Sequence, residues 1–447
     1  MVSVTFSGSA STGRARRRVH PAWGVAAVAF LSLLAAAGFR AAPGALMVPL
    51  NAEFGWSTTV MSLAVSVNLL LYGLTAPFAA ALMDRFGLRR VVATALALVA
   101  LGAGGSVMMT ASWQLVVFWG VMIGLGTGSM ALVFAATVAN RWFVERRGLV
   151  MGVLTAGSAT GQLIFLPPVA AIAESSGWRA ASLLVAAVAL AAVPIAWLVL
   201  RDHPEDRGVL PFGADPATYV APVRAHGGAA KRAVEGLAYA SHRRDFWALA
   251  AAFAICGATT NGLIGIHFIP SAHDHGMSTT VAAGLLAVVG VFDIVGTIAS
   301  GWLTDTFDPR LLLVSYYAFR GVGLLLLPWL LSETVHPSMI AFIVIYGLDW
   351  VATVPPTAAL CRELFGERGT IVFGWVFASH QLGAAAAALG AGVIRDTLGT
   401  YTYAWWGGAA LCAIAAVLSI LVRRSPGGVP ALASVPVEPG PPVPGEM

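Results

Sequence analysis

Twelve mostly apolar stretches of about 20 residues run along this chain, and they constrain its fold more than any other feature. An α-helix of about that length crosses the roughly 30 Å hydrocarbon core of a bilayer. Only 11% of the 447 residues are charged, against about 25% in soluble domains. We therefore predict an all-α integral membrane protein with twelve transmembrane helices. The stretches occupy residues 22–48, 57–82, 91–110, 113–139, 148–173, 180–200, 246–269, 279–303, 311–331, 338–360, 370–394 and 402–422.

The basic residues predict the orientation. If the N-terminus lies in the cytoplasm, 22 of the 26 basic residues fall on the cytoplasmic side, and only Arg179 and Arg395 fall in outer loops. Cytoplasmic loops of membrane proteins carry an excess of arginine and lysine, so both termini are predicted to be cytoplasmic. We expect the lipid bilayer, and no nucleic acid, as the partner of this basic chain.

A polar stretch between the sixth and seventh segments divides the helices into two sets of six. A proline-rich end without periodicity is typical of disorder. The predicted units are a basic cytoplasmic tail over 1–21, a six-helix bundle over 22–200, a cytoplasmic central loop over 201–245, a second six-helix bundle over 246–422 and a disordered cytoplasmic tail over 423–447.

The two sets of helices look like copies of one unit. Residues 55–60 (Gly-Trp-Ser-Thr-Thr-Val) recur as 276–281 with Met in place of Trp, at a shift of 221. Matches at this shift extend over six helices, and glycines of the fifth and eleventh segments match after a slip of one residue. Coincidence could explain the glycines but not the Ser-Thr-Thr-Val run. We therefore predict a duplicated six-helix unit.

The loop after the second segment carries the charged motif 82–90 (Leu-Met-Asp-Arg-Phe-Gly-Leu-Arg-Arg). This motif and the duplicated halves resemble the major facilitator superfamily, which implies two parallel bundles with substrate held between them. A carboxylate and arginines at helix ends can latch the halves in one state, whereas positive-inside charge alone is the alternative. The matching residues are Asp84, Arg85, Gly87 and Arg89, with Asp305 and Arg310 in the second half.

Ionisable groups inside membrane helices are costly and are default functional candidates. Arg40 lies in the first helix, and its repeat equivalent is Asn261 in the seventh. The resemblance implies that these two helices line the central cavity. The planar guanidinium of Arg40 suits a carboxylate, so we expect substrate contact there. A structural pair or a snorkelling side chain is the alternative.

Two aspartates and one arginine lie deep in the second half. Asp293 is in the eighth segment, Arg320 in the ninth and Asp349 in the tenth. Either aspartate is a candidate carrier of a transported proton. Counted from the intervening loop, Asp293 and Arg320 lie at similar depth, so we expect Arg320 to be the structural charge partner of Asp293.

Further polar residues are weaker candidates for substrate binding. His380 and Gln381 lie near the middle of the eleventh segment, where the histidine could titrate or be a hydrogen-bonded core residue. Asn68 and Tyr72 in the second segment and Gln162 in the fifth complete the set.

Several strings resemble bacterial carriers related to the monocarboxylate transporters and the oxalate–formate carriers. They are residues 49–57 after Arg40, 141–148, 346–350 and 380–384. The resemblance implies import or exchange of small organic anions, often with a proton. It also implies that the basic residue of helix 1 is Arg40 and the acid of helix 8 is Asp293. The family often has an arginine one turn after that acid, where this chain has Thr297.

The sequence therefore predicts a secondary transporter in a bacterial inner membrane that moves a small organic anion, a monocarboxylate, by alternating access with proton symport. It predicts no enzyme activity, no catalytic residues, no cofactor and no metal site, and a monomer. An efflux antiporter for drugs or metabolites is the rival within the fold, although the usual glycine-proline signature is absent from segment 148–173. A membrane-embedded nutrient sensor is the rival of another class.

Overall fold

The computed structural model describes residues 20–423 apart from residues 131, 218 and 220–227. The predicted terminal tails therefore lie almost wholly outside the described residues. The helices are α1 (Pro21–Phe54), α2 (Thr58–Phe86), α3 (Leu88–Ser106), α4 (Ser112–Leu115), η1 (Val116–Ile123), α5 (Gly124–Ser129), α6 (Leu132–Trp142), α7 (Arg147–Ser176), α8 (Trp178–Val199), η2 (Pro204–Arg207), α9 (Ala229–Ser241), α10 (Arg244–Gly257), η3 (Ala258–Ile264), α11 (Gly265–Asp274), α12 (Thr279–Thr306), α13 (Pro309–Leu330), α14 (Pro337–Asp349), α15 (Val354–Phe365), η4 (Gly366–Arg368), α16 (Gly369–Leu398) and α17 (Thr402–Leu421).

A helix or a run of consecutive helices covers each of the twelve predicted segments. Ten helical stretches of the described chain are long and apolar enough to cross a membrane. One of them, Pro337–Leu398, contains the two predicted segments 338–360 and 370–394. The all-helical membrane architecture is thus confirmed, whereas the count of twelve crossings and the cytoplasmic termini stay predictions.

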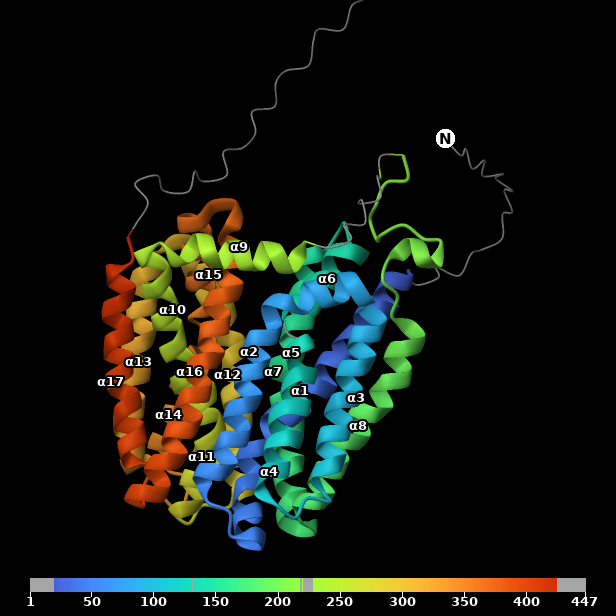
Figure 1. Ribbon diagram of the computed structural model, residues 1–447. Helices are drawn as coiled ribbons and strands as arrows, with labels where there is room; N and C mark the ends of the chain where they lie inside the picture. Colours follow the sequence, from blue (N-terminus) through green and yellow to red (C-terminus); the bar gives the residue numbers. More distant parts are fainter. Residues whose placement is uncertain (1–19, 131, 218, 220–227, 424–447) are drawn as a thin grey trace, which may run out of the picture.

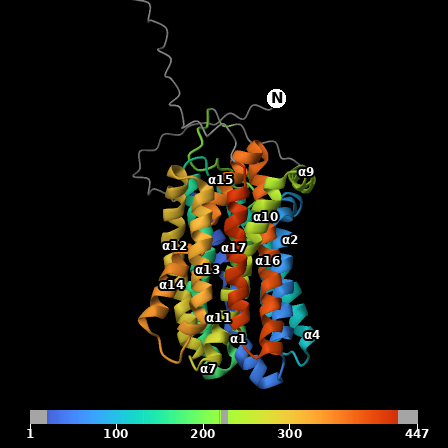
Figure 2. The ribbon, with the colours of Figure 1, turned by 90° about the vertical axis from the view of Figure 1, so that its left-hand side faces the viewer.

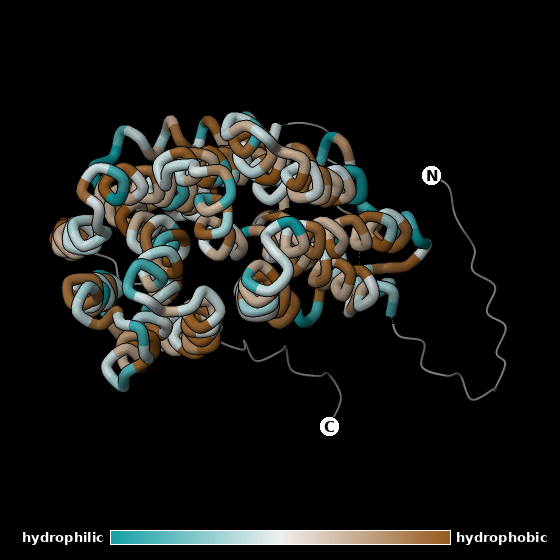
Figure 3. The backbone as a smooth tube through the Cα atoms, turned by 90° about the horizontal axis from the view of Figure 1, so that it is seen from below, coloured by the Kyte–Doolittle hydropathy of each residue, from teal (hydrophilic) through white to brown (hydrophobic). Residues whose placement is uncertain are grey.

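The helices form two groups that stand side by side (Figures 1 and 3). The first group holds α1 to α8 and the second holds α10 to α17, and α13 lies beside α17 at the edge of the second group (Figure 2). Large apolar side chains such as Leu101, Leu190 and Ile298 are more than 60% exposed. Exposed apolar surface of this extent suits contact with lipid rather than with water.

Inside the predicted central loop lies a helix, α9, which runs across one end of both groups (Figure 1). It contacts α2 of the first half and α16 of the second. The indole Nε1 of Trp375 donates a hydrogen bond to the backbone oxygen of Ala233 at 2.8 Å. The loop is therefore a structural connection between the halves at the end predicted to be cytoplasmic.

The two halves meet along α2 with α16 and α7 with α12. Small residues permit the approach, as expected for helices in a membrane. A Cβ added at Gly73 of α2 would lie 2.6 Å from the Cβ of Gln381 on α16. A Cβ at Gly44 of α1 would lie 3.0 Å from the backbone oxygen of Ile266 and 3.4 Å from that of its repeat partner Gly265. Repeat-related positions therefore face each other across the interface.

The tenth segment is broken between α14 and α15, and the two prolines that follow the break explain it. Proline has no N–H to donate four residues back, so Pro355 and Pro356 leave the carbonyls of Val351 and Ala352 without their helical donors. The carbonyl of Val351 accepts instead from Val354 N–H at 2.9 Å. The carbonyl of Ala352 accepts from Ser300 Oγ of α12 at 2.5 Å. Polar side chains of the neighbouring helices thus hold this break.

Candidate functional site

Arg40 lies where the backbone of α1 is weakened. Pro43 removes the N–H that would bind the carbonyl of Phe39. The Nη1 atom of Arg40 donates to the hydroxyl of Tyr72 on α2 at 3.3 Å, and its guanidinium carbon lies 4.7 Å from the centre of that ring. Arg40 lines two adjacent small cavities. A half-buried cation between two small cavities can bind an anion entering either one.

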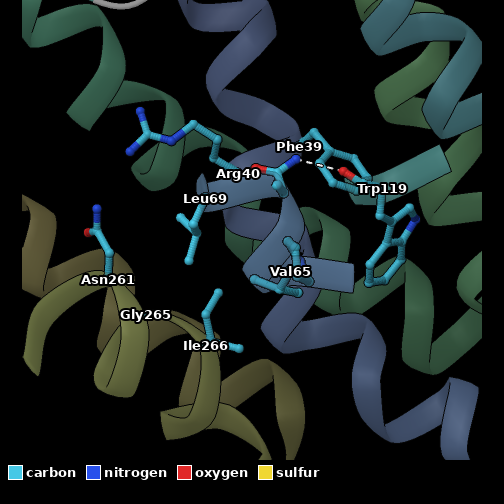
Figure 4. A pocket seen from close by; sticks show the side chains of 10 residues that line it. Phe39, Arg40, Val65, Leu69, Trp119, Asn261, Gly265 and Ile266 are labelled. Atoms are coloured by element: carbon cyan, nitrogen blue, oxygen red, sulfur yellow. Dashed lines mark hydrogen bonds between the residues drawn. The ribbon is translucent and has the colours of Figure 1, made fainter. Parts of the chain in front are cut away.

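Asn261 faces Arg40 from the other half of the protein (Figure 4). It lies in η3, a π-helical segment, and such wide turns occur often at functional sites. Its amide has no hydrogen-bond partner within the described part of the chain and stays half-buried. The prediction that Arg40 and Asn261 line one cavity therefore agrees with the geometry, and an amide opposite an arginine can hydrogen-bond an anion that the arginine holds.

The cavity between Arg40 and Asn261 also has apolar lining residues, which sequence reasoning missed. Phe39, Val65, Leu69 and Trp119 come from the first half, and Ile266 comes from the second (Figure 4). Two of these side chains, Leu69 and Val65, lie one and two turns before Tyr72 on α2. These two residues lie on the same face of α2 as the polar candidate Tyr72, and this helical spacing could have predicted that they line the cavity.

Two predicted site residues of α2 have clear roles. Asn68 is buried and donates from Nδ2 to the backbone oxygen of Trp119 at 2.7 Å, the bond drawn in Figure 4. Trp119 lies in the π-helical segment η1, where carbonyls can lose their regular donors. Asn68 therefore supports the cavity wall, while Tyr72 contacts Arg40 directly.

The candidates of α16 lie apart from the two cavities. The ring of His380 stacks on Phe377 with centroids 5.8 Å apart and lies 4.9 Å from the ring of Phe253. The Nδ1 atom of His380 and the Oε1 atom of Gln381 are buried and have no hydrogen-bond partner in the described chain. Neither residue lines the cavities at Arg40. The side chain of Gln162 lies outside what the structure describes.

The charge partner of Arg320 is Asp349 and not Asp293, which corrects the pairing expected from depth. The Nε atom of Arg320 lies 2.6 Å from Oδ2 of Asp349, and its Nη2 donates to the backbone oxygen of Asp349 at 2.7 Å. Nη1 contacts Cys256 Sγ at 3.0 Å and Thr259 Oγ1 at 3.4 Å. Since α14 ends at Asp349, this arginine also binds the exposed carbonyls at the helix break.

Asp293 contributes to the same break from α12. Its Oδ1 atom accepts hydrogen bonds from Val351 N–H at 3.0 Å and from Thr297 Oγ1 at 3.1 Å. The side chain is buried, and no arginine, lysine or histidine nitrogen of the described chain lies within 4 Å of it. Asp293 is thus a buried carboxyl group bonded to neutral donors, while Asp349 is bonded to a cation.

The charged motif near the inner end of α2 binds within its own half. Asp84 Oδ1 lies 2.6 Å from Nη2 of Arg141 at the end of α6. Arg89 lies over the ring of Trp197 and donates its backbone N–H to Asp202 Oδ1 at 3.3 Å. In this conformation these contacts join helices of the first half to one another and to the start of the central loop, so the predicted latch between the halves stays a prediction.

The other motif residues are placed as follows. Gly87 has φ +86°, and a Cβ there would lie 2.6 Å from Oδ2 of Asp202. Arg85 lies over the ring of Phe86. In the second half, Asp305 is exposed, and Arg310 binds Asp308 at 2.7 Å rather than Asp305. The two copies of the motif therefore differ in their pairing.

Comparisons with known proteins agree with this architecture. The family model of the Major Facilitator Superfamily matches residues 28–373. Among solved structures, the D-xylose-proton symporter has a TM-score of 0.67 at 15% identity and covers 89% of this chain and 97% of its own. At that identity the likeness concerns the fold alone.

Curated relatives match most of the chain as well. The uncharacterised MFS-type transporter YcxA of Bacillus subtilis is 26% identical over 429 residues, which are 90% of this chain and 95% of that protein. Monocarboxylate transporter 13 of Rattus norvegicus is 28% identical and covers 85% of this chain and 84% of its own. Monocarboxylate transporter 11 of Mus musculus is 29% identical, with coverage of 85% and 82%.

Proposed function

This chain belongs to the Major Facilitator Superfamily of membrane transporters and is not an enzyme, and we propose that it carries a small monocarboxylate across a bacterial inner membrane by alternating access. The observation that carries the proposal is Arg40 facing Asn261 across the boundary between the halves. A ligand held by both residues contacts both halves at once. Such a ligand has a different contact free energy in each conformation, which is what shifts a conformational equilibrium.

The chemistry of the cavity supports a carboxylate. A guanidinium presents a planar pair of donors that match the two oxygens of a carboxylate. The other side chains that line the cavity between Arg40 and Asn261 are mainly apolar, and both cavities at Arg40 are small. We therefore infer a substrate with one carboxylate and a short apolar body. Its carboxylate would bind Arg40 and Asn261, and its body would pack on Phe39 and Trp119.

We also propose that the transport is coupled to a proton and that Asp293 carries it. A buried ionised carboxyl group without a cation is costly in a membrane interior, so a proton on Asp293 lowers that cost. Asp349 instead lies 2.6 Å from the guanidinium of Arg320, a cation that Asp293 lacks. His380 remains a proposed substrate contact for another conformation, because it lies outside both cavities here.

The test is uptake by the purified protein in proteoliposomes. A panel of radiolabelled monocarboxylates is offered with and without an inward proton gradient, and liposomes without protein provide the background. We expect accumulation of at least one acid, faster with the gradient. The Asp293→Asn variant is expected to lose the stimulation by the gradient but to retain exchange of labelled for unlabelled acid.

Each other outcome has a clear consequence. Exchange in the unaltered protein without a response to the gradient would contradict proton coupling and leave the anion proposal intact. Absence of flux for every acid of the panel would contradict the anion proposal itself.

A further inference from the structure

Two carboxylates cross between the halves at the end that the charge distribution predicts to be outside. Asp396 on α16 accepts the backbone N–H of Thr58 on Oδ1 at 3.1 Å and that of Thr59 on Oδ2 at 2.6 Å. Glu174 on α7 accepts the backbone N–H of Thr280 on Oε1 at 2.9 Å and its hydroxyl on Oε2 at 2.6 Å. Each half thus supplies an acid to a helix N-terminus of the other half. We call these contacts the outer clasps.

The outer clasps are two copies of one device. Thr58 and Thr59 correspond to 279 and 280 at the repeat shift of 221, and Glu174 corresponds to Asp396 at the slipped shift of 222. The first clasp joins α2 to α16, and the second joins α12 to α7. The same helices, exchanged between the halves, therefore meet in the same way. This reciprocity makes a chance contact of flexible side chains an inadequate explanation.

The local chemistry explains why these acids bind there. The first N–H groups of a helix have no partner within the helix, and its N-terminus carries partial positive charge. Ser57 caps α2 by accepting the N–H of Val60 at 3.3 Å, which leaves the N–H groups of Thr58 and Thr59 for Asp396. In α12, Ser278 likewise accepts from Val281 at 3.3 Å. In each helix the serine accepts the N–H of the valine three residues later, and the acid from the other half accepts N–H groups of the threonines between them.

Two other acids of this end bind within their own halves. Glu53 pairs with Arg179 at 2.7 Å in the first half. Asp274 pairs with Arg395 at 2.7 Å in the second half. Separating the halves would leave these two ion pairs intact but would break both outer clasps.

The opposite end of the molecule is more open between the halves. A cavity there is lined by residues of α2 and α6 from the first half, α16 from the second and α9 between them. At the outer end, by contrast, α2 and α16 are so close that a Cβ at Gly392 would lie 3.0 Å from the backbone oxygen of Thr58. The halves therefore pack tightly at the predicted outer end and leave a cavity between them at the predicted inner end.

We propose that Glu174 and Asp396 are gate residues whose outer clasps hold the protein in this outward-closed state. The proposal rests on the alternating access of the proposed function but not on the identity of its substrate. Opening the outer end exposes the freed N–H groups to water and replaces these donors with water at both carboxylates. Since the carboxylates are already exposed, each clasp is a modest restraint, and the pair sets how often the outer end opens.

The experiment measures the distance between the halves directly. Spin labels are placed at Met108→Cys and Val335→Cys, exposed positions in outer loops of opposite halves, and read by pulsed electron resonance in lipid nanodiscs without substrate. The three native cysteines are buried. We compare the background protein with Glu174→Ala, Asp396→Ala and the double variant. The loss of one cap is expected to raise the ratio of outward-open to outward-closed molecules about tenfold, and the loss of both about a hundredfold.

Controls separate the clasps from a general effect of removing charge. Glu53→Ala removes an acid of the same end whose partner lies in its own half, so it is expected to leave the distances unchanged. Glu174→Asp together with Asp396→Glu keeps both carboxylates and is expected to retain most of the closed population. Melting temperatures verify that all variants are folded. An unchanged distribution in the double variant, or an equal shift in Glu53→Ala, would overturn the proposal. Because substrate is absent, this result is independent of the uptake assay.

Discussion

Replacing Asp349 with leucine should destabilise the protein strongly, because it leaves the charge of Arg320 buried without its counter-ion. The side chains of the pair are 0% and 6% exposed, and Nε and Oδ2 are 2.6 Å apart. Breaking a buried ion pair by removing one partner costs about 3–5 kcal/mol. We expect the free energy of unfolding of the Asp349→Leu variant to fall by about that amount, which is a large part of the stability of a typical domain.

Removing both charges should be less harmful than removing one. In the double variant Arg320→Met with Asp349→Leu, no buried charge remains, and an apolar pair of similar volume is close to neutral. The backbone oxygens of Asp349 and Trp350 lose their donor, however, at about 1–3 kcal/mol for an unsatisfied group. The double variant is therefore expected between the unaltered protein and the single variant. The two changes are coupled by about 2 kcal/mol or more.

The assay is unfolding of the purified variants in one detergent, followed by intrinsic tryptophan fluorescence. Asp305→Leu serves as the control, because this exposed carboxylate has no ion pair in the described chain, and it should change stability by less than about 0.5 kcal/mol. A single variant as stable as the unaltered protein, or a double variant less stable than Asp349→Leu, would refute the reasoning.

Three further outcomes are expected. Ser300→Ala should lower stability by about 1–3 kcal/mol in the same unfolding assay, because the carbonyl of Ala352 loses its donor at the helix break; an unchanged midpoint would contradict this. Gly87→Ala should destabilise by about 1 kcal/mol or more, since φ is positive and the added Cβ meets Asp202, and equal stability would show that the loop relaxes. Asn261→Ala should raise the KM of uptake several-fold while the melting temperature stays the same, and a parallel fall in melting temperature would indicate a structural role instead.

Much of the fold could be predicted because membrane helices leave a strong signal in the sequence. Segment length and hydropathy located each of the ten stretches that are long and apolar enough to cross a membrane, and the repeat relates positions that meet between the halves. Gly44 and Gly265 are a matched pair in the sequence and lie at the crossing of α1 and α11. The break in the tenth segment follows from Pro355 and Pro356, whose missing N–H groups are known from the sequence.

The partner of Arg320 could not be predicted in the same way. Depth can be counted from a loop, but the rotation of a helix about its axis needs an amphipathic pattern, and these helices are apolar on most faces. Counting residues from the loop placed Arg320 at the depth of Asp293. In the structure, the rotation of the helices about their axes and the break after α14 place Arg320 against Asp349 instead. The α9 helix was also missed, because it lies in a polar segment that was interpreted as a loop.

The residues of the outer clasps could have been identified as repeat-related positions from the sequence. The repeated Ser-Thr-Thr run marks two equivalent helix N-termini, and the slipped alignment pairs Glu174 with Asp396. Nothing in either segment says, however, that the acid of one half meets the helix of the other. That step requires the packing of α7 on α12 and of α16 on α2.

The most direct test of the account is the kinetics of carboxylate uptake by Arg40 variants in proteoliposomes. Arg40→Gln removes the charge, and Arg40→Lys keeps the charge but loses the planar pair of donors. Arg179→Gln, which alters an arginine of the outer end, serves as the matched control. The account predicts that Arg40→Gln abolishes saturable uptake, that Arg40→Lys retains it with a KM raised at least tenfold, and that the control is unaffected. Normal carboxylate uptake by Arg40→Gln would contradict it.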